Sequence, residues 1–186
     1  MKSLQSNRLV LHILGESDAE LVLDYFSRNR DFLQEWEPRR DAEFYTLKTH
    51  KTILAGETIQ MARGQLLKVW IAKKEQPDTI IGSASLSNIV RGAFQSCHLG
   101  YRLAGEEVRK GYMTEAVERL IEYGFQDLHL HRIEANIMPR NKASLGVVTK
   151  LGFANEGLSP KYLYINGVWE DHIHMVLLNE NWEETE

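Results

Sequence analysis

The stretch Val108-Arg109-Lys110-Gly111-Tyr112-Met113-Thr114-Glu115-Ala116 predicts a turn between a strand and a helix, and the rest of the chain is arranged around it. Residues 97–103 before it have a strand pattern, and apolar residues recur at helical spacing after it, at Val117, Leu120, Ile121, Phe125 and Leu128. The first N–H groups of a helix lack partners within it, and the helix dipole adds about half a positive charge there. We therefore expect a phosphate seat, supplemented by Arg109 and Lys110, in which Gly111 lets the backbone approach a ligand closely.

The alternative for this turn is an ordinary strand-to-helix connection with exposed basic residues. The turn has neither the Gly-Lys-Thr/Ser ending of a Walker phosphate loop nor the Gly-x-Gly-x-x-Gly pattern of a dinucleotide fold. A phosphate bound here is therefore expected to belong to another kind of carrier.

Composition favours one compact domain over residues 1–186. The chain is 43% hydrophobic, enough for a substantial core, and no Pro/Gly/Ser-rich linker divides it. Its net charge of −4 argues against nucleic acid as a direct partner, because such binding needs a clustered basic face. A local basic patch of Arg102, Arg109 and Lys110 still suits a small polyanion.

The sequence does not predict a cysteine nucleophile, a metal site, secretion or a membrane span. The single cysteine, Cys97, lies in an apolar strand pattern and is interpreted as a buried small hydrophobe. The histidine pairs His129/His131 and His172/His174 lack a third ligand, so we expect no metal. Without a secretion signal or about 20 consecutive apolar residues, a cytoplasmic protein, monomeric or homodimeric, is expected.

The remaining chain predicts further strands and helices. Strands are expected at residues 8–14, 66–72, 79–87, 131–138, 162–165 and 172–177, and helices after Asp18, at residues 44–54 and at residues 143–150. Residues 76–78 are expected to turn, and Asn166-Gly167 predicts a hairpin. Asn141 or its neighbour caps the last helix, and Gly152 closes it.

Two separated segments carry a family resemblance. Asn141-Lys142-Ala143-Ser144, upstream of Leu151-Gly152-Phe153, resembles the second cofactor-contacting segment of the GCN5-related N-acetyltransferases (GNAT), and the opening turn resembles their pyrophosphate-binding segment. Further segments resemble the RimJ branch, the bacterial ribosomal-protein-alanine N-acetyltransferases: Phe32-Leu33, Trp36-Glu37-Pro38, residues 88–92, residues 99–101, Tyr162-Leu163, Asn166-Gly167, Trp169 and Asp171-His172. The resemblance runs from Arg8 to about Trp182.

The resemblance implies an α/β GNAT fold, a mixed, mostly antiparallel twisted sheet of about seven strands with helices on both faces. It implies that the strand before the turn and strand 131–138 splay apart around the cofactor. It also implies transfer of an acetyl group from acetyl-coenzyme A to an amine. The implied acceptor is a protein N-terminal amine, with alanine on a small-subunit ribosomal protein as the leading case.

The cofactor residues implied by the resemblance lie in three places. Tyr101 and Leu103 would line the cofactor, Asn141 would contact the pantetheine arm, and the pyrophosphate would meet Arg109, Lys110, Gly111, Tyr112, Met113 and Thr114. The family pattern is Gln/Arg-x-x-Gly-x-Gly/Ala, whereas this chain has Val108 and Met113 at its ends. Arg109 replaces a common glycine and must therefore adopt glycine-like dihedral angles.

The catalytic residues are less well defined. Val148 occupies the position of the family's tyrosine thiol donor, so Ser144 becomes the candidate donor, or else is simply a first-turn helix residue. Asn136 replaces a possible glutamate base and could orient a water, and Glu134 shares its face as a base or as an ion-pair partner. Further candidate bases are Glu37, His98, Asp171 and His174.

The acceptor groove is expected around residues 36–45, 88–94 and 164–169. Its candidate residues are Trp36, Glu37, Asn88, Arg91, Tyr164 and Trp169. Other amines, including polyamines, fit the same architecture. A protein that senses acetyl-coenzyme A without turnover and a nucleotide-binding regulator are the alternatives from other classes.

Overall fold

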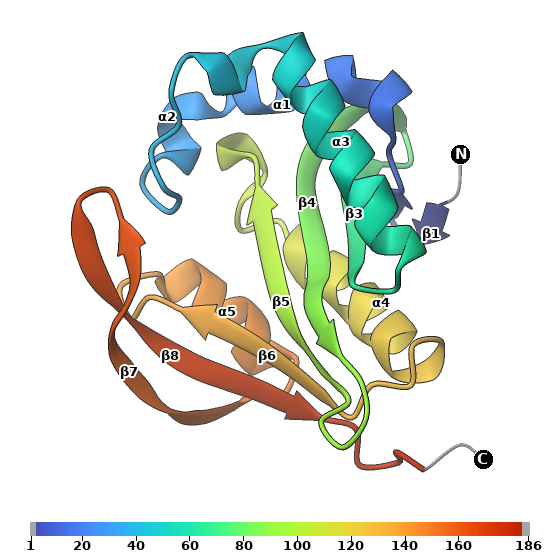
Figure 1. Ribbon diagram of the computed structural model, residues 1–186, viewed down its shortest axis with the longest axis vertical. Coiled ribbons are helices and arrows are strands. Elements are labelled where there is room, and N and C mark those ends of the chain that lie inside the picture. Colours follow the sequence, from blue (N-terminus) through green and yellow to red (C-terminus); the bar gives the residue numbers. More distant parts are fainter. Residues whose placement is uncertain (1–2, 184–186) are drawn as a thin grey trace.

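A computed structural model describes residues 3–183, and its frame is one eight-stranded sheet (Figure 1). The strands lie in the order β1-β2-β3-β4-β5-β6-β8-β7. Their bounds are β1 Ser3–Gln5, β2 Leu9–His12, β3 Leu66–Lys73, β4 Gln76–Val90, β5 Ser96–Leu103, β6 Arg132–Ile137, β7 Ala154–Ile165 and β8 Val168–Leu178. Only β5 and β6 pair in parallel; every other neighbouring pair is antiparallel. The prediction of a mixed, mostly antiparallel sheet is confirmed.

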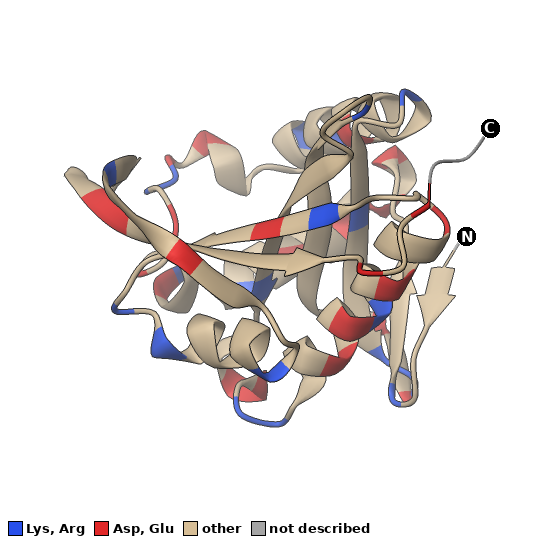
Figure 2. Cartoon of the chain, turned by 90° about the horizontal axis from the view of Figure 1, so that it is seen from below, with Lys and Arg blue, Asp and Glu red and all other residues tan. Residues whose placement is uncertain are grey.

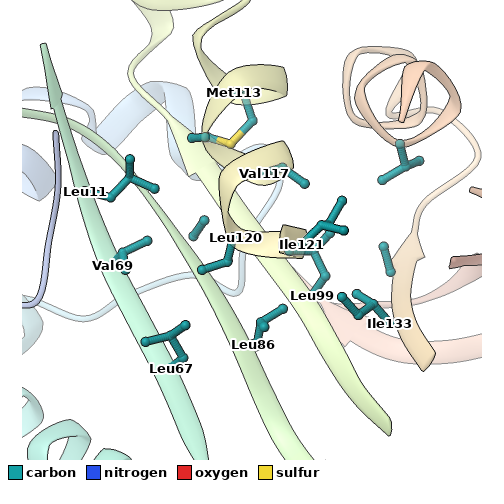
Figure 3. Packing of buried hydrophobic residues seen from close by; sticks show 14 of the residues in the cluster. Leu11, Leu67, Val69, Leu86, Leu99, Met113, Val117, Leu120, Ile121 and Ile133 are labelled. Carbon is teal, nitrogen blue, oxygen red and sulfur yellow. The ribbon is translucent and has the colours of Figure 1, made fainter. Parts of the chain in front are cut away.

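The helices lie on both faces of the sheet, as predicted. Their bounds are α1 Ala19–Arg28, α2 Arg30–Leu33, α3 Leu47–Ala62, α4 Tyr112–Gln126 and α5 Lys142–Lys150, with short 3-10 turns η1 Glu16–Asp18, η2 Glu43–Tyr45 and η3 Gly105–Glu107. On one face, α4 buries Val117 and Leu120 against Leu86, Leu99 and Ile133 (Figure 3). Burying each such side chain contributes about 1.5–3 kcal/mol, so this core fixes α4 and its preceding turn on the sheet.

A second core lies on the other face, under α1 and α3. It contains Tyr25, Phe26, Leu54 and Trp70, which are buried, and the rings of Tyr25 and Trp70 meet edge to face with centroids 6.0 Å apart. α3 starts after Thr46, whose side chain accepts a hydrogen bond from the Thr49 amide. The predicted helix over residues 44–54 is thus too short and starts too early, because packing carries the helix through Gly56, where propensity favours a break.

The strands β5 and β6 pair over only three residues and then part. The pairs are Ser96↔Arg132, Cys97↔Ile133 and His98↔Glu134. Beyond His98, β5 continues to Leu103 beside β4, while β6 continues to Ile137 beside β8. Figure 1 shows the two strands diverging, β5 upward and β6 toward the β7–β8 hairpin. The splay implied by the family resemblance is confirmed, and we call the last shared pair, His98 and Glu134, the apex.

Some predicted boundaries were wrong for local reasons. β1 was not predicted, because three edge residues carry no periodic signal. The turn between β3 and β4 lies at Lys74-Glu75 rather than at residues 76–78, and β7 begins at Ala154, with irregular pairing between Ser159 and Leu163 that hides its alternation. The Asn166-Gly167 hairpin is confirmed, with φ of 50° and 89° as a type I′ turn requires.

Charged residues are spread over the whole fold. In the view of Figure 2, acidic and basic positions are interspersed over strands, helices and loops. No helix within residues 3–183 combines the length and apolar character needed to cross a bilayer.

Candidate cofactor and acceptor site

The turn before α4 presents free backbone amides. Gly111 is the N-cap of α4 with φ 80°, and Arg109 has φ 63°, so both are left-handed. Turns of this kind point successive N–H groups into an anion-binding concavity. Within residues 3–183, none of the amides of residues 109–114 donates a hydrogen bond. The prediction that Arg109 adopts glycine-like dihedral angles is confirmed, and the strain costs about 1–3 kcal/mol.

Two distant residues brace this turn from behind. The Arg8 guanidinium donates to the Glu115 carboxylate at 2.7 Å and to the Lys110 carbonyl at 3.1 Å, and it lies over the Tyr112 ring at 4.5 Å. Glu115 also accepts from the Ser6 hydroxyl at 2.7 Å. Burial raises the pKa of Glu115, but the hydrogen bonds from Arg8 and Ser6 outweigh it and leave the pKa below its ordinary value. No local sequence signal singles out Arg8 or Glu115, because they are 107 positions apart.

The two basic residues of the turn differ in their surroundings. Lys110 Nζ lies 2.9 Å from Glu107, a buried carboxylate that Lys73 also contacts at 3.1 Å. Burial raises the pKa of Glu107, but the hydrogen bonds and charges of Lys110 and Lys73 outweigh burial and leave the pKa below its ordinary value. The carboxylate therefore stays ionised. Arg109 makes no ion pair within the described residues. Arg109 is therefore the cation that can meet an incoming anion without first giving up a carboxylate.

A hydroxyl pair joins β5 to α5. Tyr101 on β5 donates to the Ser144 carbonyl at 2.9 Å and accepts from the Ser144 hydroxyl at 2.8 Å. Asn141 caps α5 by accepting from the Ser144 amide at 3.1 Å, as predicted. Burial raises the pKa of Tyr101 to about 12, so its hydroxyl stays protonated at neutral pH. Val148 is fully buried in the core.

Two more residues of the central strands have defined surroundings. Leu103 ends β5 and packs, partly buried, against the core. Cys97 is buried, and burial raises its pKa to about 12. A thiol in that environment is a structural hydrophobe, as predicted, rather than a nucleophile.

The apex carries a polar network on the sheet face opposite α4. Glu134 accepts from His174 Nδ1 at 2.8 Å and from Arg132 at 3.1 Å, and His98 Nε2 lies 3.9 Å away. Burial raises the pKa of Glu134, but the hydrogen bonds from His174 and Arg132 leave it below its ordinary value. Asn136 donates to the Tyr162 hydroxyl at 3.4 Å, and its buried carbonyl oxygen has no partner among the described residues.

The α2 loop and the β7–β8 hairpin meet beside the open end of the splay. Arg140 lies over the Trp36 ring at 5.1 Å and contacts Glu170 at 3.1 Å, and Asn166 at the hairpin tip donates to the Gln34 carbonyl at 2.7 Å. Figure 1 shows the two segments close together at one end of the molecule. These contacts join the α2 loop to the β7–β8 hairpin.

The acceptor candidates on these two segments have different exposures. Glu37 is held by Arg102 at 3.0 Å and by Arg40 at 3.7 Å. Tyr164 and Trp169 are 57% and 58% exposed, with ring centroids 5.5 Å apart on the hairpin. Exposed aromatic pairs of this kind are available to pack against a bound chain.

Not all acceptor candidates come together. Asn88 reaches His98 at 3.2 Å and so belongs with the apex. Arg91 lies in the β4–β5 connection, where it donates to Gln95 at 3.3 Å and to the Leu128 carbonyl. Arg102, the partner of Glu37, is at the other end of β5. The structure does not bring Arg91 to the other acceptor candidates.

No group of three or more His, Cys, Asp or Glu side chains within residues 3–183 is arranged to hold a metal ion. The histidines of the predicted pairs have other contacts: the His131 ring meets the Trp182 ring edge to face, with centroids 6.0 Å apart. His174 is bound to Glu134, and His172 Nδ1 lies 3.1 Å from the Glu170 carbonyl.

Comparisons with known proteins agree with this geometry. A family model described as an acetyltransferase (GNAT) domain matches residues 8–154. The ribosomal protein uS5-alanine N-acetyltransferase of Escherichia coli strain K12 is 36% identical over 179 residues, which cover 96% of this chain and 92% of that protein.

Solved structures extend the similarity to the whole fold. The ribosomal-protein-S5-alanine acetyltransferase of Vibrio fischeri superposes with a TM-score of 0.93 at 38% identity, covering 99% of this chain and 100% of that one. Mycobacterium smegmatis RimJ in complex with CoA-disulfide superposes with a TM-score of 0.89 at 25% identity, covering 99% of this chain and 90% of that one.

Proposed function

Because the chain belongs to the GNAT family of acetyltransferases, we propose that it transfers the acetyl group of acetyl-coenzyme A to the N-terminal amine of a protein. The leading acceptor is an N-terminal alanine on a small-subunit ribosomal protein. The names of the Escherichia coli and Vibrio fischeri relatives give this acceptor for those proteins. Residues 1–186 act as one domain in this proposal, and the cytoplasm is its compartment. The observation that carries it is the splay of β5 and β6 beside a turn of free amides.

The free amides suit the diphosphate of coenzyme A. The N–H groups of residues 109–114 and the positive end of the α4 dipole favour an anion at this turn. Gly111 supplies the left-handed φ of 80° that this turn needs, and Arg109 adds a cation that forms no ion pair within residues 3–183. Val108 and Met113 differ from the residues of the family pattern. Because main-chain N–H groups make the proposed contacts, these side-chain differences leave the seat intact.

The pantetheine arm fits the gap between the two strands. Beyond His98, the edge of β5 that faces β6 is not paired with it, so its backbone groups are available to a bound chain. Tyr101 and Leu103 on β5 and Asn141, the N-cap residue of α5, are the residues proposed to line this gap. A thioester is an activated acyl donor. The protein therefore has to position the thioester, remove a proton from the acceptor ammonium, donate a proton to the leaving thiolate and stabilise the developing charge.

The hydroxyl pair of Tyr101 and Ser144 is the proposed proton donor to the leaving thiolate. The two oxygens are 2.8 Å apart, and the Tyr101 hydroxyl is fully protonated at neutral pH. Once Ser144 has given up its proton, the Tyr101 hydroxyl, which donates to the Ser144 carbonyl in this structure, can turn to donate to Ser144 Oγ instead. This arrangement substitutes for the tyrosine that is absent at Val148.

The amine is proposed to arrive on the open face at the apex. Asn136 is proposed to orient a water through its unpartnered carbonyl oxygen, and Glu134 is proposed to act beside it. An N-terminal amine has an ordinary pKa near ~8, so a base of moderate strength suffices. Trp36, Glu37, Tyr164 and Trp169 frame the path of the acceptor, with Asn88 at the apex.

A peptide panel tests the proposal. Acetyl-coenzyme A is incubated with peptides that differ only in the first residue, and with an N-terminally blocked peptide that contains an internal lysine. We expect a mass gain of one acetyl group on the alanine-initiated peptide and none on the blocked one. Tight cofactor binding without transfer to any amine would indicate a sensor, and equal binding of ATP a nucleotide-binding regulator.

A further inference from the structure

A small pocket lies between α1, α2 and η2, next to the loop that carries the acceptor candidate Glu37. Its lining includes Phe26, Arg30, Glu37, Arg40 and Tyr45, and we call it the arginine pocket. Its volume of about 20 Å³ is somewhat larger than the 10–15 Å³, roughly, that one water-sized group needs. The arginine pocket therefore suits a small terminal group rather than a whole side chain.

Two arginines supply the charge of the arginine pocket. The Arg30 guanidinium lies over the Tyr45 ring at 4.6 Å, and the Arg40 guanidinium lies over the Phe44 ring at 4.7 Å. Stacking on a ring fixes the plane of a guanidinium and leaves the N–H groups at its edge free to donate. Among the residues that the structure describes, the Arg30 guanidinium has no ion pair. Arg30 is thus a cation with unused donors.

The negative charge of the arginine pocket is already matched. Within residues 3–183, Glu37 is the one carboxylate in the lining, and it lies 3.0 Å from Arg102 and 3.7 Å from Arg40. Arg30 is therefore left without a counter-charge in the lining. A carboxylate is the group that matches the planar donor fork of a guanidinium.

One face of β5 joins the apex to the arginine pocket. Side chains alternate along a strand, and Leu99 packs into the core beneath α4. His98, Gly100 and Arg102 therefore lie on the opposite face. The Arg102 guanidinium lies over the ring of Phe26, in the pocket lining, at 5.5 Å. This row of alternate residues thus leads from the apex to the arginine pocket.

A glycine keeps the middle of this row clear. Gly100 is exposed although β5 is an inner strand of the sheet. A Cβ at Gly100 would meet only Ser85 Oγ, at an ordinary 3.6 Å, so the packing of the fold does not require a glycine there. Glycine inside a strand weakens it and often marks a place where a ligand comes close. An extended chain can therefore lie along this face of β5.

Strand spacing gives the length of this path. His98 and Arg102 are four residues apart, which is about 13 Å at about 3.3 Å per residue. An extended acceptor has the same spacing, so an acceptor with its amine at the apex has its fifth residue opposite Arg102. Because glutamate and arginine side chains are long, a carboxylate on the third, fourth or fifth residue can reach the arginine pocket.

We propose that the arginine pocket binds the carboxylate of an acidic residue at the third to fifth position of the acceptor, an inference that rests on the proposed function. Arg30 and Arg40 donate to the carboxylate oxygens, and the rings of Tyr45 and Phe44 hold the two guanidinium groups in place. The contact selects among alanine-initiated chains and takes no part in the acetyl transfer itself. The substrate class is therefore an N-terminal amine closely followed by an acidic side chain.

Peptides that differ in one side chain test this selectivity. The series consists of alanine-initiated, C-terminally amidated and otherwise uncharged peptides with one glutamate at position 2, 3, 4, 5 or 6, each compared with its glutamine counterpart. We expect the KM of the glutamate peptide to be about ten-fold lower at one or more of positions 3 to 5. The kcat should change little, because the contact is the same before and during the reaction.

Variants of the two arginines test where this preference arises. Arg30→Gln and Arg40→Gln should each bring the KM values of the glutamate and glutamine peptides together. Arg30→Lys keeps the charge without the planar fork and should retain part of the preference. Arg30→Glu should instead favour a lysine at the same peptide position. Arg63→Gln, at the exposed end of α3, is the matched control and should keep the wild-type preference.

The outcomes separate the arginine pocket from the proposed function. Equal KM values for glutamate and glutamine peptides at every position, measured with the wild-type protein alone, would overturn the pocket assignment and leave acetyl transfer in place. A preference that survives in both glutamine variants would also overturn it. A raised KM for acetyl-coenzyme A in these variants would assign the arginines to the cofactor instead. Wild-type protein that acetylates no N-terminal amine would overturn the proposed function.

Discussion

The two ends of the splay are built from different chemistry. At the α4 end, free main-chain amides form the seat, and side chains such as Arg8 and Glu115 only hold its shape. At the apex, the contacts are made by side chains: Glu134 binds His174, which in turn contacts Ser159 on β7. A main-chain seat tolerates changes such as Val108 and Arg109, whereas the apex depends on the identity of each residue. The following predictions test this contrast, from the largest expected effect to the smallest.

The main-chain seat should fail when a side chain enters it. Gly111→Glu adds an anion to the turn proposed to hold the diphosphate and, because a Cβ at Gly111 would lie 3.4 Å from Arg8 Nη2, it also disturbs the brace behind that turn. Like charges placed close together cost several kcal/mol. We expect coenzyme A affinity to fall by about a hundred-fold or more in calorimetry. Gly64→Glu is the matched control, because Gly64 is also left-handed, at φ 69°, but lies in open space after α3. Equal loss in both variants would mean that backbone strain, not the seat, explains the effect.

Removing the Tyr101 hydroxyl should affect turnover rather than binding. We expect Tyr101→Phe to lower kcat by about 10- to 100-fold with little change in the KM for acetyl-coenzyme A. Because burial raises the pKa of Tyr101 to about 12, this hydroxyl is protonated throughout the neutral range. The loss should therefore be the same at about pH 6.5 and about pH 9. A loss that disappears at high pH would move Tyr101 to the base side of the reaction.

The brace behind the seat should contribute stability that depends on pH. We expect Glu115→Gln to lower the free energy of unfolding by about 1 kcal/mol at pH 7, a modest value because Arg8 is half-exposed. The folded pKa of Glu115 is depressed, so its contribution is present above the unfolded pKa of about 4.3 and is lost as pH falls through the folded value.

Urea denaturation at several pH values measures this effect. The two proteins should converge toward about pH 3, where the carboxylate is protonated. Glu118→Gln, an exposed position on the same helix, should change little. A destabilisation of Glu115→Gln that persists at low pH would show that the ionised pair is not its source.

The hairpin should contribute to acceptor binding alone. Trp169 is 58% exposed, so Trp169→Ala should raise the KM for a peptide acceptor by a few-fold, about 1 kcal/mol, and leave the KM for acetyl-coenzyme A unchanged. Ile59→Ala, at a 53% exposed position on α3, controls for loss of exposed apolar surface. A parallel rise in both KM values would place the hairpin effect on the fold rather than on the acceptor.

The sequence could predict the features that depend on neighbouring residues, but not the contacts between residues far apart in the chain. The turn before α4, the cap at Asn141 and the Asn166-Gly167 hairpin are local patterns, and each was predicted correctly. Arg8 and Glu115 meet across 107 positions, and Ser159 meets His174 only through the β7–β8 pairing. No spacing rule brings such partners together, so these contacts could not be read from the chain.

Strand direction accounts for the misplaced acceptor candidate. Arg91 was grouped with Trp36 by resemblance, but the β4–β5 hairpin carries it to the far end of β5. Alternation along β6 correctly predicted that Glu134 and Asn136 share a face. It could not reveal that His174 would reach across from β8 to bind Glu134.

Amide chemical shifts of residues 109–114, followed by nuclear magnetic resonance during titration, test the diphosphate seat most directly. Coenzyme A should shift these amides strongly, whereas pantetheine, which lacks the diphosphate, should perturb only the residues of β5 and β6 beyond the apex. Amides at residues 109–114 that stay unchanged at saturating coenzyme A, or that respond equally to pantetheine, would contradict the account.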